Sequence, residues 1–509
     1  MNLSKNRMYW LVWALGSIFL VIYLGTTMLI GDDKTFFTPG EMTGGHHQMG
    51  ISCDSCHTKE FNEKEDFQES CIACHGDERV KPFDSHPANK FTDPRNASLL
   101  EEINATQCVT CHIEHRPEVT SKGGFTQQQD FCIHCHADIG EERESHKEMS
   151  FMTCNDAGCH NYHDNRAIYT DFLLKHLDDP DLLEKHRLAE KDFGARIAEI
   201  ATYPHKAFPV KQAGAEDVSE NASKSLAKAS HTHTGIMDDW LTTRHAKSGV
   251  TCDACHMQEV TSNSSVSTKE EKPKLEWIDR PDTTSCATCH DIETKHFQEG
   301  KHGMRLKVGL SPMTPAQARL PMHQDSLDKP LNCVTCHSAH AFDVKKAAVE
   351  GCLQCHVDDH SLAYQDSKHA ELWQKELSGE LPKGSGVSCA SCHMPRVELD
   401  VSEWMERVVV MHNQNFNLVP NEKMIRPVCM ECHGLEYSIN ALSDDELVRK
   451  NFNGTSRFKT DSMRLVDEEQ KRYEAKRKKR KEVREKEEKA KAKETEVKES
   501  KAEESSDAN

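Results

Sequence analysis

Cysteine and histidine stand out among the residues that could carry chemistry in this chain of 509 residues, which holds 22 cysteines and 31 histidines. Ten copies of Cys-x-x-Cys-His use twenty of the cysteines, as Cys53 and Cys56, Cys71 and Cys74, Cys108 and Cys111, Cys132 and Cys135, Cys252 and Cys255, Cys286 and Cys289, Cys333 and Cys336, Cys352 and Cys355, Cys389 and Cys392, and Cys429 and Cys432. The remaining two, Cys154 and Cys159, precede His160 and form an eleventh pair, expanded by two residues that include the permissive Gly158.

The repeated motif has a specific chemical use. Two thiols at this spacing can form thioethers to the vinyl edge of one porphyrin, and the adjoining histidine then binds the iron. A structural zinc site would need pairs of cysteine pairs, and a redox dithiol would occur once. We therefore expect eleven covalent haems, the alternative at the expanded motif being a loop with two idle thiols. The expected proximal ligands are His57, His75, His112, His136, His160, His256, His290, His337, His356, His393 and His433.

Twenty further histidines are available as second, distal ligands for eleven irons. Histidine is a better candidate than the 18 methionines, because paired histidine ligands lower the reduction potential relative to a histidine and a methionine. The candidates are His46, His47, His86, His115, His146, His163, His245, His302, His340, His360, His369 and His412. A surface or hydrogen-bonded histidine is the alternative at each of these positions.

These motifs make residues 53 to 433 resemble the multihaem c-type cytochromes. Residues 231 to 445, with "HAKSGVTCDACHM" and "SGVSCASCHMPR", are similar to the superfamily of hydroxylamine oxidoreductase and pentahaem cytochrome c nitrite reductase. The first half resembles class III-like modules, which also contain expanded motifs. The likeness transfers no catalytic site, because those nitrite reductases mark their catalytic haem with Cys-x-x-Cys-Lys and every motif here ends in histidine. The tyrosine cross-linked to haem in hydroxylamine oxidoreductase also has no match, since Tyr437 and Tyr473 follow the last motif.

The composition indicates what must hold these sites in place. Only 36% of the chain is hydrophobic and 6% aromatic, which is low for conventional protein cores. Haem can supply the missing apolar interior. We therefore expect a mainly α fold with much irregular loop and little sheet, organised around the haems, and an apoprotein that is largely unfolded.

Motif spacing divides the chain. The longest gap, 98 residues between Cys154 and Cys252, separates five motifs from six. We predict an N-terminal anchor at 1–31, a five-haem module at 32–210, a linker at 211–234, a six-haem module at 235–460 and a charged tail at 461–509. Spacings of 18 and 37 residues in the first half, and of 19 and 37 in the second, hint at related subarrays.

The two ends of the chain differ sharply in character. Lys5 and Arg7 precede an uncharged run over 8–31, which predicts a single membrane-spanning helix with its basic end in the cytoplasm. A cleaved signal peptide is the alternative, although the run ends without an Ala-x-Ala-like site. The haem region would then lie in the periplasm at a bacterial inner membrane. The tail over 467–509 carries 15 basic and 14 acidic residues, so it is either a solvated helix or disordered.

Charge and site chemistry together favour electron transfer as the function. Without the 467–509 tail the chain holds 49 basic and 69 acidic residues, and this excess favours encounters with basic electron carriers. The expected partners are a quinol-oxidising membrane protein and periplasmic cytochromes or reductases, without nucleic acid and with homo-oligomers possible. The alternative is an oxidoreductase that acts on nitrite, hydroxylamine or a related oxyanion at one open haem. A scaffold for a respiratory complex would leave the haem sites unexplained.

Overall fold

The structure is a computed structural model that carries the chain alone. It describes residues 5–29, 35–59, 63–80, 94, 97–98, 104, 106–120, 126, 132–143, 146–147, 163, 170–184, 235–259, 275–402, 405–418, 421–459 and 461–506. The predicted linker at 211–234 and the expanded motif at Cys154 lie outside these residues.

The prediction of a mainly helical fold with much irregular loop is confirmed. The helices before the long motif gap and within it are α1 (Lys5–Leu29), α2 (Gly44–Met49), α3 (Lys64–Val80), α5 (Cys108–Cys111), α6 (Ile133–His136), α7 (Ile139–Glu142) and α8 (Thr170–Lys175). Those after it are α11 (Ile236–Thr242), α12 (Arg244–Lys247), α13 (Asp253–His256), α14 (Thr283–Ala287), α15 (Asp291–Glu299), α16 (Met304–Lys307), α17 (Cys333–His337), α18 (Val344–Leu353), α19 (Asp359–Ala363), α20 (Lys368–Ser378), α21 (Cys389–His393), α22 (Leu435–Leu442), α23 (Asp445–Arg449) and α24 (Ser462–Ser506).

Strands are few among the described residues. β1 (Met257–Glu259) pairs antiparallel with β2 (Leu275–Trp277), and Met257 lies opposite Trp277. β3 (Arg396–Ser402) pairs antiparallel with β4 (Met405–Val410) in a second two-stranded sheet. Each sheet pairs two strands that follow one another along the chain. The rest of the body is built from short helices and turns.

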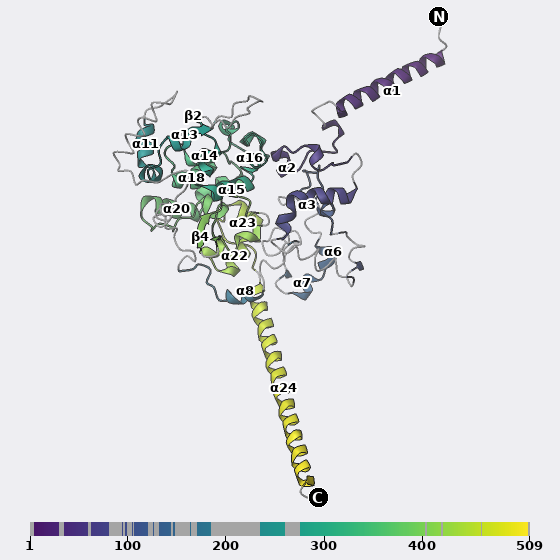
Figure 1. Cartoon of the computed structure of the whole chain (residues 1–509), viewed down its shortest axis with the longest axis vertical. Helices are drawn as coiled ribbons and strands as arrows, with labels where there is room; N and C mark the ends of the chain where they lie inside the picture. The colour runs from purple at the N-terminus through teal and green to yellow at the C-terminus, as the bar shows by residue number, and fades with distance from the viewer. Residues whose placement is uncertain are drawn as a thin grey trace, which may run out of the picture.

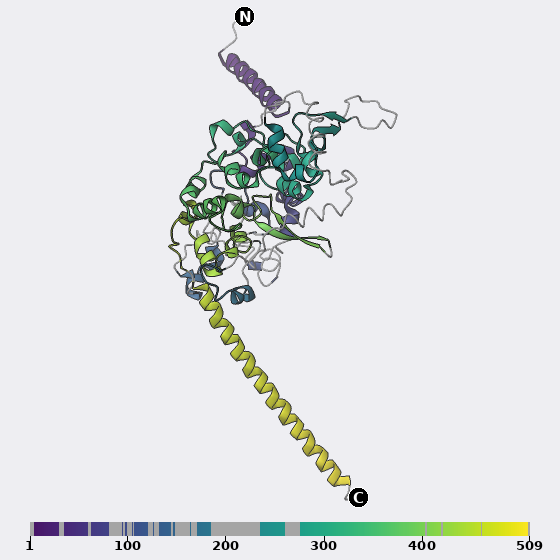
Figure 2. The same ribbon diagram turned by 90° about the vertical axis from the view of Figure 1, so that its left-hand side faces the viewer.

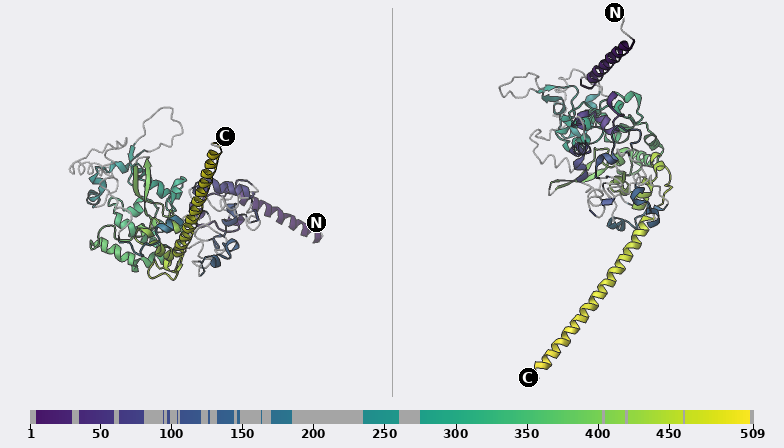
Figure 3. Two further views of the ribbon diagram at one scale, coloured as in Figure 1. Left: turned by 90° about the horizontal axis from the view of Figure 1, so that it is seen from below. Right: turned by 90° about the vertical axis from the view of Figure 1, so that its right-hand side faces the viewer.

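Two lobes lie side by side in the body, the first built around α3 and α6 and the second around α14 to α23 (Figure 1). The same separation is visible from below (Figure 3). Two long helices leave the body at opposite ends: α1 at the N-terminus and α24 at the C-terminus (Figures 1 and 2). α24 shows that the charged tail, for which helix and disorder were both open, forms a helix over 462–506.

One apolar helix is long enough to cross a bilayer. Asn6–Thr27 spans 22 residues with none of its surface buried in the protein, and at about 1.5 Å per residue it matches the thickness of a hydrocarbon core of about 30 Å. An anchor and a signal peptide both meet this criterion, and the residues described contain no second such helix.

Among the described residues, buried apolar side chains form three small clusters, which lie in the second half of the chain. The largest contains Met424, Ile425, Met430, Leu435, Ile439, Leu442 and Met463. Two smaller clusters centre on Trp240 and on Trp373. Such limited clusters agree with the expectation that side chains alone do not supply the interior of this fold.

Residues 170–184 pack against the second lobe although they precede the long linker in sequence. Phe172, Leu173 and Leu177 contact the largest apolar cluster, and Arg426 lies over the ring of Phe172 at 4.0 Å. The backbone N–H of Leu183 donates to the carbonyl of Cys432 at 2.7 Å. This segment, which the predicted five-haem module includes, therefore supports the last motif of the chain.

Candidate haem sites

Each of the ten regular motifs forms a helical turn, and in the nine whose side chains are all described the turn places the three functional residues on one side. Asn332 and Ser388 directly precede motif cysteines and cap α17 and α21, because their side chains accept hydrogen bonds from the backbone N–H three residues later. In seven motifs the backbone N–H of the histidine donates to the backbone carbonyl of the first cysteine, four residues earlier, at 2.8–3.0 Å. Residues at i, i+3 and i+4 share one helix face, so both thiols and the imidazole of a motif point the same way.

Nine motif histidines lie opposite a second histidine, and the ring centroids of each pair are 6.0–6.4 Å apart. We name each site by its first cysteine. The pairs are His57 with His115 (Cys53 site), His75 with His46 (Cys71 site), His112 with His163 (Cys108 site), His256 with His340 (Cys252 site), His290 with His245 (Cys286 site), His337 with His412 (Cys333 site), His356 with His302 (Cys352 site), His393 with His360 (Cys389 site) and His433 with His369 (Cys429 site).

This spacing suits two imidazoles bound to the same metal ion. A metal–nitrogen bond of about 2 Å on each side puts the two ring centres roughly 6 Å apart. Direct stacking between the rings would bring the centres closer, as for Tyr437 on His433 at 4.4 Å. The thiol pair beside each motif histidine adds the groups that haem c needs for its thioether bonds. The donor set and its spacing therefore both fit haem c with two histidine ligands.

Hydrogen bonds at Nδ1 hold several of these imidazoles with Nε2 toward the opposite ring. A backbone carbonyl accepts from the Nδ1 of His115, His256, His360, His412 and His433 at 2.6–3.0 Å, the acceptors being Gly40, Ile278, Val448, Val410 and Asp181. A carbonyl can only accept, so Nδ1 carries the proton and Nε2 is the nitrogen able to bind a metal. No sequence motif marks these acceptors, since every residue has a carbonyl.

Burial favours the neutral form of several paired histidines, which is the form that binds metal. Burial, together with a smaller effect of the partner histidine, lowers the pKa of His302, His337 and His393 to about 4 each. Aromatic side chains also fix ring positions: Trp277 stacks on His256 with the ring centroids 4.6 Å apart. Tyr437, noted in the sequence only as following the last motif, stacks on the motif histidine His433.

Successive motifs are neighbours in space. Hydrogen bonds join the thiols of Cys71 and Cys108, Cys286 and Cys333, and Cys352 and Cys389. Other thiols lie near enough to influence one another electrostatically: Cys56 and Cys74, Cys255 and Cys286, Cys336 and Cys352, and Cys392 and Cys429. The six sites of the second half thus form one unbroken series from Cys252 to Cys429, and the first three sites form another.

The two halves share a pattern in which a site takes its distal histidine from a segment beside another motif. In the first half, the Cys53 site pairs with His115, three residues after the third motif histidine, and the Cys71 site pairs with His46, seven residues before Cys53. In the second half, the Cys252 site pairs with His340, three residues after His337, and the Cys286 site pairs with His245, seven residues before Cys252.

His115 and His340 also share the left-handed backbone conformation, with φ of 65° and 70°. Non-glycine residues rarely adopt this conformation, so its recurrence at equivalent ligands is structural support for a repeat. The repeat aligns the motifs beginning at Cys53, Cys71 and Cys108 with those at Cys252, Cys286 and Cys333. The spacings of 18 and 37 and of 19 and 37 residues suggested a different alignment.

Nine of the twelve predicted distal histidines are thus brought opposite a motif histidine. Of the other three, His47 is exposed, His146 is half-buried with a pKa lowered by burial, and His86 lies outside the described residues. The motif histidine His136 is described, but its distal partner stays a prediction, as does the whole Cys154 site.

Haem counting tests the assignment of the expanded motif. We predict eleven covalent haems on the holoprotein, and ten after the double change of Cys154 and Cys159 to serine, because thioether attachment requires both thiols. Mass spectrometry of the intact protein resolves the difference. Ten haems on the unchanged protein would show that the expanded motif is an ordinary loop.

Comparison with known proteins supports a cytochrome. A family model described as Cytochrome c3 matches residues 45–137 and 244–357, and each match covers four motifs. A protein named cytochrome c-552 from Haemophilus ducreyi is 28% identical over 137 residues, which is 22% of this chain and 26% of that protein. The chain thus spans about a quarter of the length of this relative. No solved structure matches.

Proposed function

We propose that this chain, a multihaem c-type cytochrome of the electron-transfer type, binds eleven haems and conducts electrons in a respiratory chain on the periplasmic side of a bacterial inner membrane. The observation that carries the proposal is the set of nine histidine pairs with centroids 6.0–6.4 Å apart. A site with two histidine ligands has no position for a substrate and is suited to exchanging electrons.

The residues of the chain have separable roles in this proposal. The cysteines tether the cofactor, and the paired histidines hold its iron from both sides. Bound haem supplies one-electron chemistry between ferric and ferrous iron. The Nδ1 hydrogen bonds fix the imidazoles, which limits rearrangement when the charge of the site changes. Within each of the two described series, contacts between successive motifs keep neighbouring sites close enough for electrons to pass from one to the next.

The alternative function, oxyanion chemistry at an open haem in residues 231–445, has less support. All six motif histidines of this half lie opposite a second histidine. Each of these irons would be fully coordinated, leaving no position for nitrite or hydroxylamine. We therefore retain electron transfer, with a quinol-oxidising membrane protein as donor and periplasmic cytochromes or reductases as acceptors.

Dye exchange tests this function directly. The reduced holoprotein should release eleven electrons to an excess of a one-electron oxidant, and should neither reduce nitrite nor oxidise hydroxylamine when suitable dyes are supplied. Sustained turnover of either compound by the purified protein would favour the oxidoreductase.

The repeat extends the ligand assignment to the two sites whose partners are not described. The Cys352 site takes His302 from between the second and third motifs of its half, and the corresponding interval of the first half, residues 76–107, holds a single histidine, His86. The Cys389 site takes His360 from between the fourth and fifth motifs, where the first half has only His146. We propose that His86 serves the Cys132 site and that His146 serves the Cys154 site.

Replacing His86 by alanine should convert one iron from low spin to high spin, because the Cys132 site would lose its second ligand. His47→Ala is the matched control, since this exposed histidine is assigned to no site. Electron paramagnetic resonance of the two oxidised variants makes the comparison. A His86 variant that stays entirely low-spin would contradict the assignment.

The apolar helix should keep the mature protein in the membrane. We expect the mature protein to retain this helix and to sediment with inner membranes, because the uncharged run ends without a small-residue cleavage site. N-terminal sequencing and membrane fractionation check this expectation. A soluble protein that begins near residue 32 would show that the helix is a signal peptide.

A further inference from the structure

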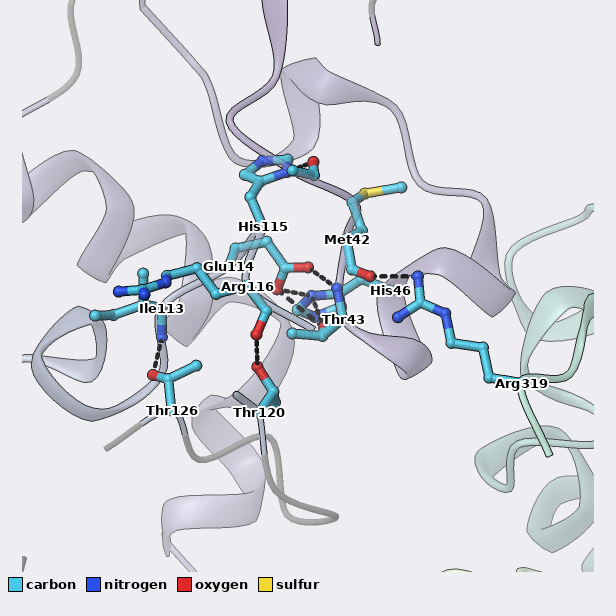
Figure 4. Close-up of polar contacts among 11 residues, drawn as sticks. Met42, Thr43, His46, Ile113, Glu114, His115, Arg116, Thr120, Thr126 and Arg319 are labelled. Carbon is cyan, nitrogen blue, oxygen red and sulfur yellow. Dashed lines mark hydrogen bonds and ion pairs between the residues drawn. The ribbon is translucent and has the colours of Figure 1, made fainter. Parts of the chain in front are cut away.

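Glu114 lies where three haem sites meet. It stands in the sequence His112-Ile113-Glu114-His115, between the motif histidine of the Cys108 site and the distal histidine of the Cys53 site. Its own side chain reaches the third site, because the Nδ1 of His46, the distal histidine of the Cys71 site, lies 2.8 Å from Glu114 Oε2 (Figure 4).

The carboxylate of Glu114 is held in this position. Thr43 donates to it twice, from the hydroxyl to Oε2 at 3.0 Å and from the backbone N–H to Oε1. Three hydrogen bonds, two from Thr43 and one with His46, therefore converge on this carboxylate and favour its charged form. Because an ionised carboxylate can only accept, Nδ1 of His46 is the donor and Nε2 faces His75.

This arrangement differs from that of the other paired histidines whose Nδ1 acceptor is described. Five of them donate to neutral backbone carbonyls. The carboxylates nearest to His290 and His356 are 3.8 and 3.9 Å away, beyond hydrogen-bond range. A hydrogen-bonded carboxylate makes imidazole a stronger electron donor to a bound metal, and its negative charge stabilises the oxidised, more positive iron.

The segment that carries His46 also touches the second lobe. Arg305 Nη1 donates to the carbonyl of Met49 at 3.1 Å, and Arg319 Nη2 donates to the carbonyl of Met42 at 2.7 Å (Figure 4 shows Arg319). Gly50, which follows α2, has φ of +61°, and a Cβ there would meet Arg305 Nη1 at 2.8 Å. Since Arg305 follows His302 by three residues, ligand-bearing segments of the two lobes meet here.

We propose that Glu114 is a positioning residue that lowers the reduction potential of the Cys71 site, at the contact between the two haem series. The proposal rests on the proposed function, because it requires iron bound between His46 and His75.

Redox titration of Glu114→Gln, followed by haem absorbance, tests the proposal without an activity assay. Glutamine keeps the shape of glutamate and removes its charge, so one of the eleven midpoint potentials should rise while every iron stays low-spin. Glu114→Asp should retain most of the wild-type value, because it keeps the charge. Glu118→Gln is the matched control: Glu118 is exposed, four residues away, and pairs only with exposed Arg116 at 3.7 Å among the contacts described.

Unchanged potentials in Glu114→Gln, or a change no larger than in Glu118→Gln, would overturn the proposal. A separate variant distinguishes this failure from failure of the ligand assignment. His46→Ala should create one high-spin iron. If it does not, His46 is not a ligand and the proposed function fails at this site. If it does while Glu114→Gln changes nothing, only the role of Glu114 is lost.

Discussion

Protein made without covalent haem attachment should lack a folded body, with nearly all tertiary structure lost. The described apolar side chains form only three small clusters, and the first half of the chain contributes to them mainly through residues 172–177. In nine pairs the centroids of two histidine rings are about 6 Å apart, so the rings do not pack directly against each other. A haem bound between them would fill this space. Burying this surface on the cofactor therefore supplies much of the driving force for folding.

Expression in cells with and without the haem-attachment machinery tests this expectation. Limited proteolysis and thermal unfolding followed by circular dichroism compare the two products. We expect rapid cleavage throughout residues 35–459 in the apoprotein and no cooperative transition from that region. The long α24 helix makes helical signal alone a poor measure, so protease resistance is the deciding observation. A cooperative unfolding transition in the apoprotein equal to that of the holoprotein would contradict a haem-built core.

Replacing His302 by alanine should open one iron in the second series and create a high-spin haem. His302 lies opposite His356 at a ring separation of 6.2 Å, and burial lowers its pKa to about 4, so its imidazole is neutral and able to bind metal. The variant should bind added imidazole or nitrite at the opened position, whereas the unchanged protein should bind neither.

His323→Ala is the matched control for this experiment. His323 is an exposed histidine that lies, like His302, between the motifs beginning at Cys286 and Cys333, and it is assigned to no site. Optical and paramagnetic resonance spectra should change in the His302 variant alone, and added imidazole should restore its low-spin form. If both variants keep the wild-type spectrum, His302 is not a ligand of the Cys352 site.

The sequence predicted the attachment residues but not which histidines share an iron. Cys-x-x-Cys-His is a local motif, so its chemistry can be read from neighbouring residues. The distal histidine of each described site belongs to a different segment: His412 lies 75 residues after His337, and His46 lies 29 residues before His75. Only the folded chain shows these pairings.

The internal repeat was equally hidden in the spacing of the motifs. The second unit has longer intervals between its first three motifs, 34 and 47 residues against 18 and 37, so the motif distances do not align. His115 and His340 each follow the third motif of their half but lie opposite the histidine of the first motif. This shared arrangement shows which motifs of the two halves correspond. No sequence signal indicated the role proposed for Glu114. This residue adjoins His115 in the sequence, but its carboxylate contacts His46 of a different site, and only the fold shows that contact.

The central claim is that histidines close every iron on both sides, and electron paramagnetic resonance tests it most directly. The oxidised holoprotein should show only low-spin ferric signals, unchanged by nitrite or hydroxylamine. A high-spin signal in the unchanged protein that disappears on addition of nitrite, together with turnover in a dye assay, would contradict the account and identify an oxidoreductase with an open haem.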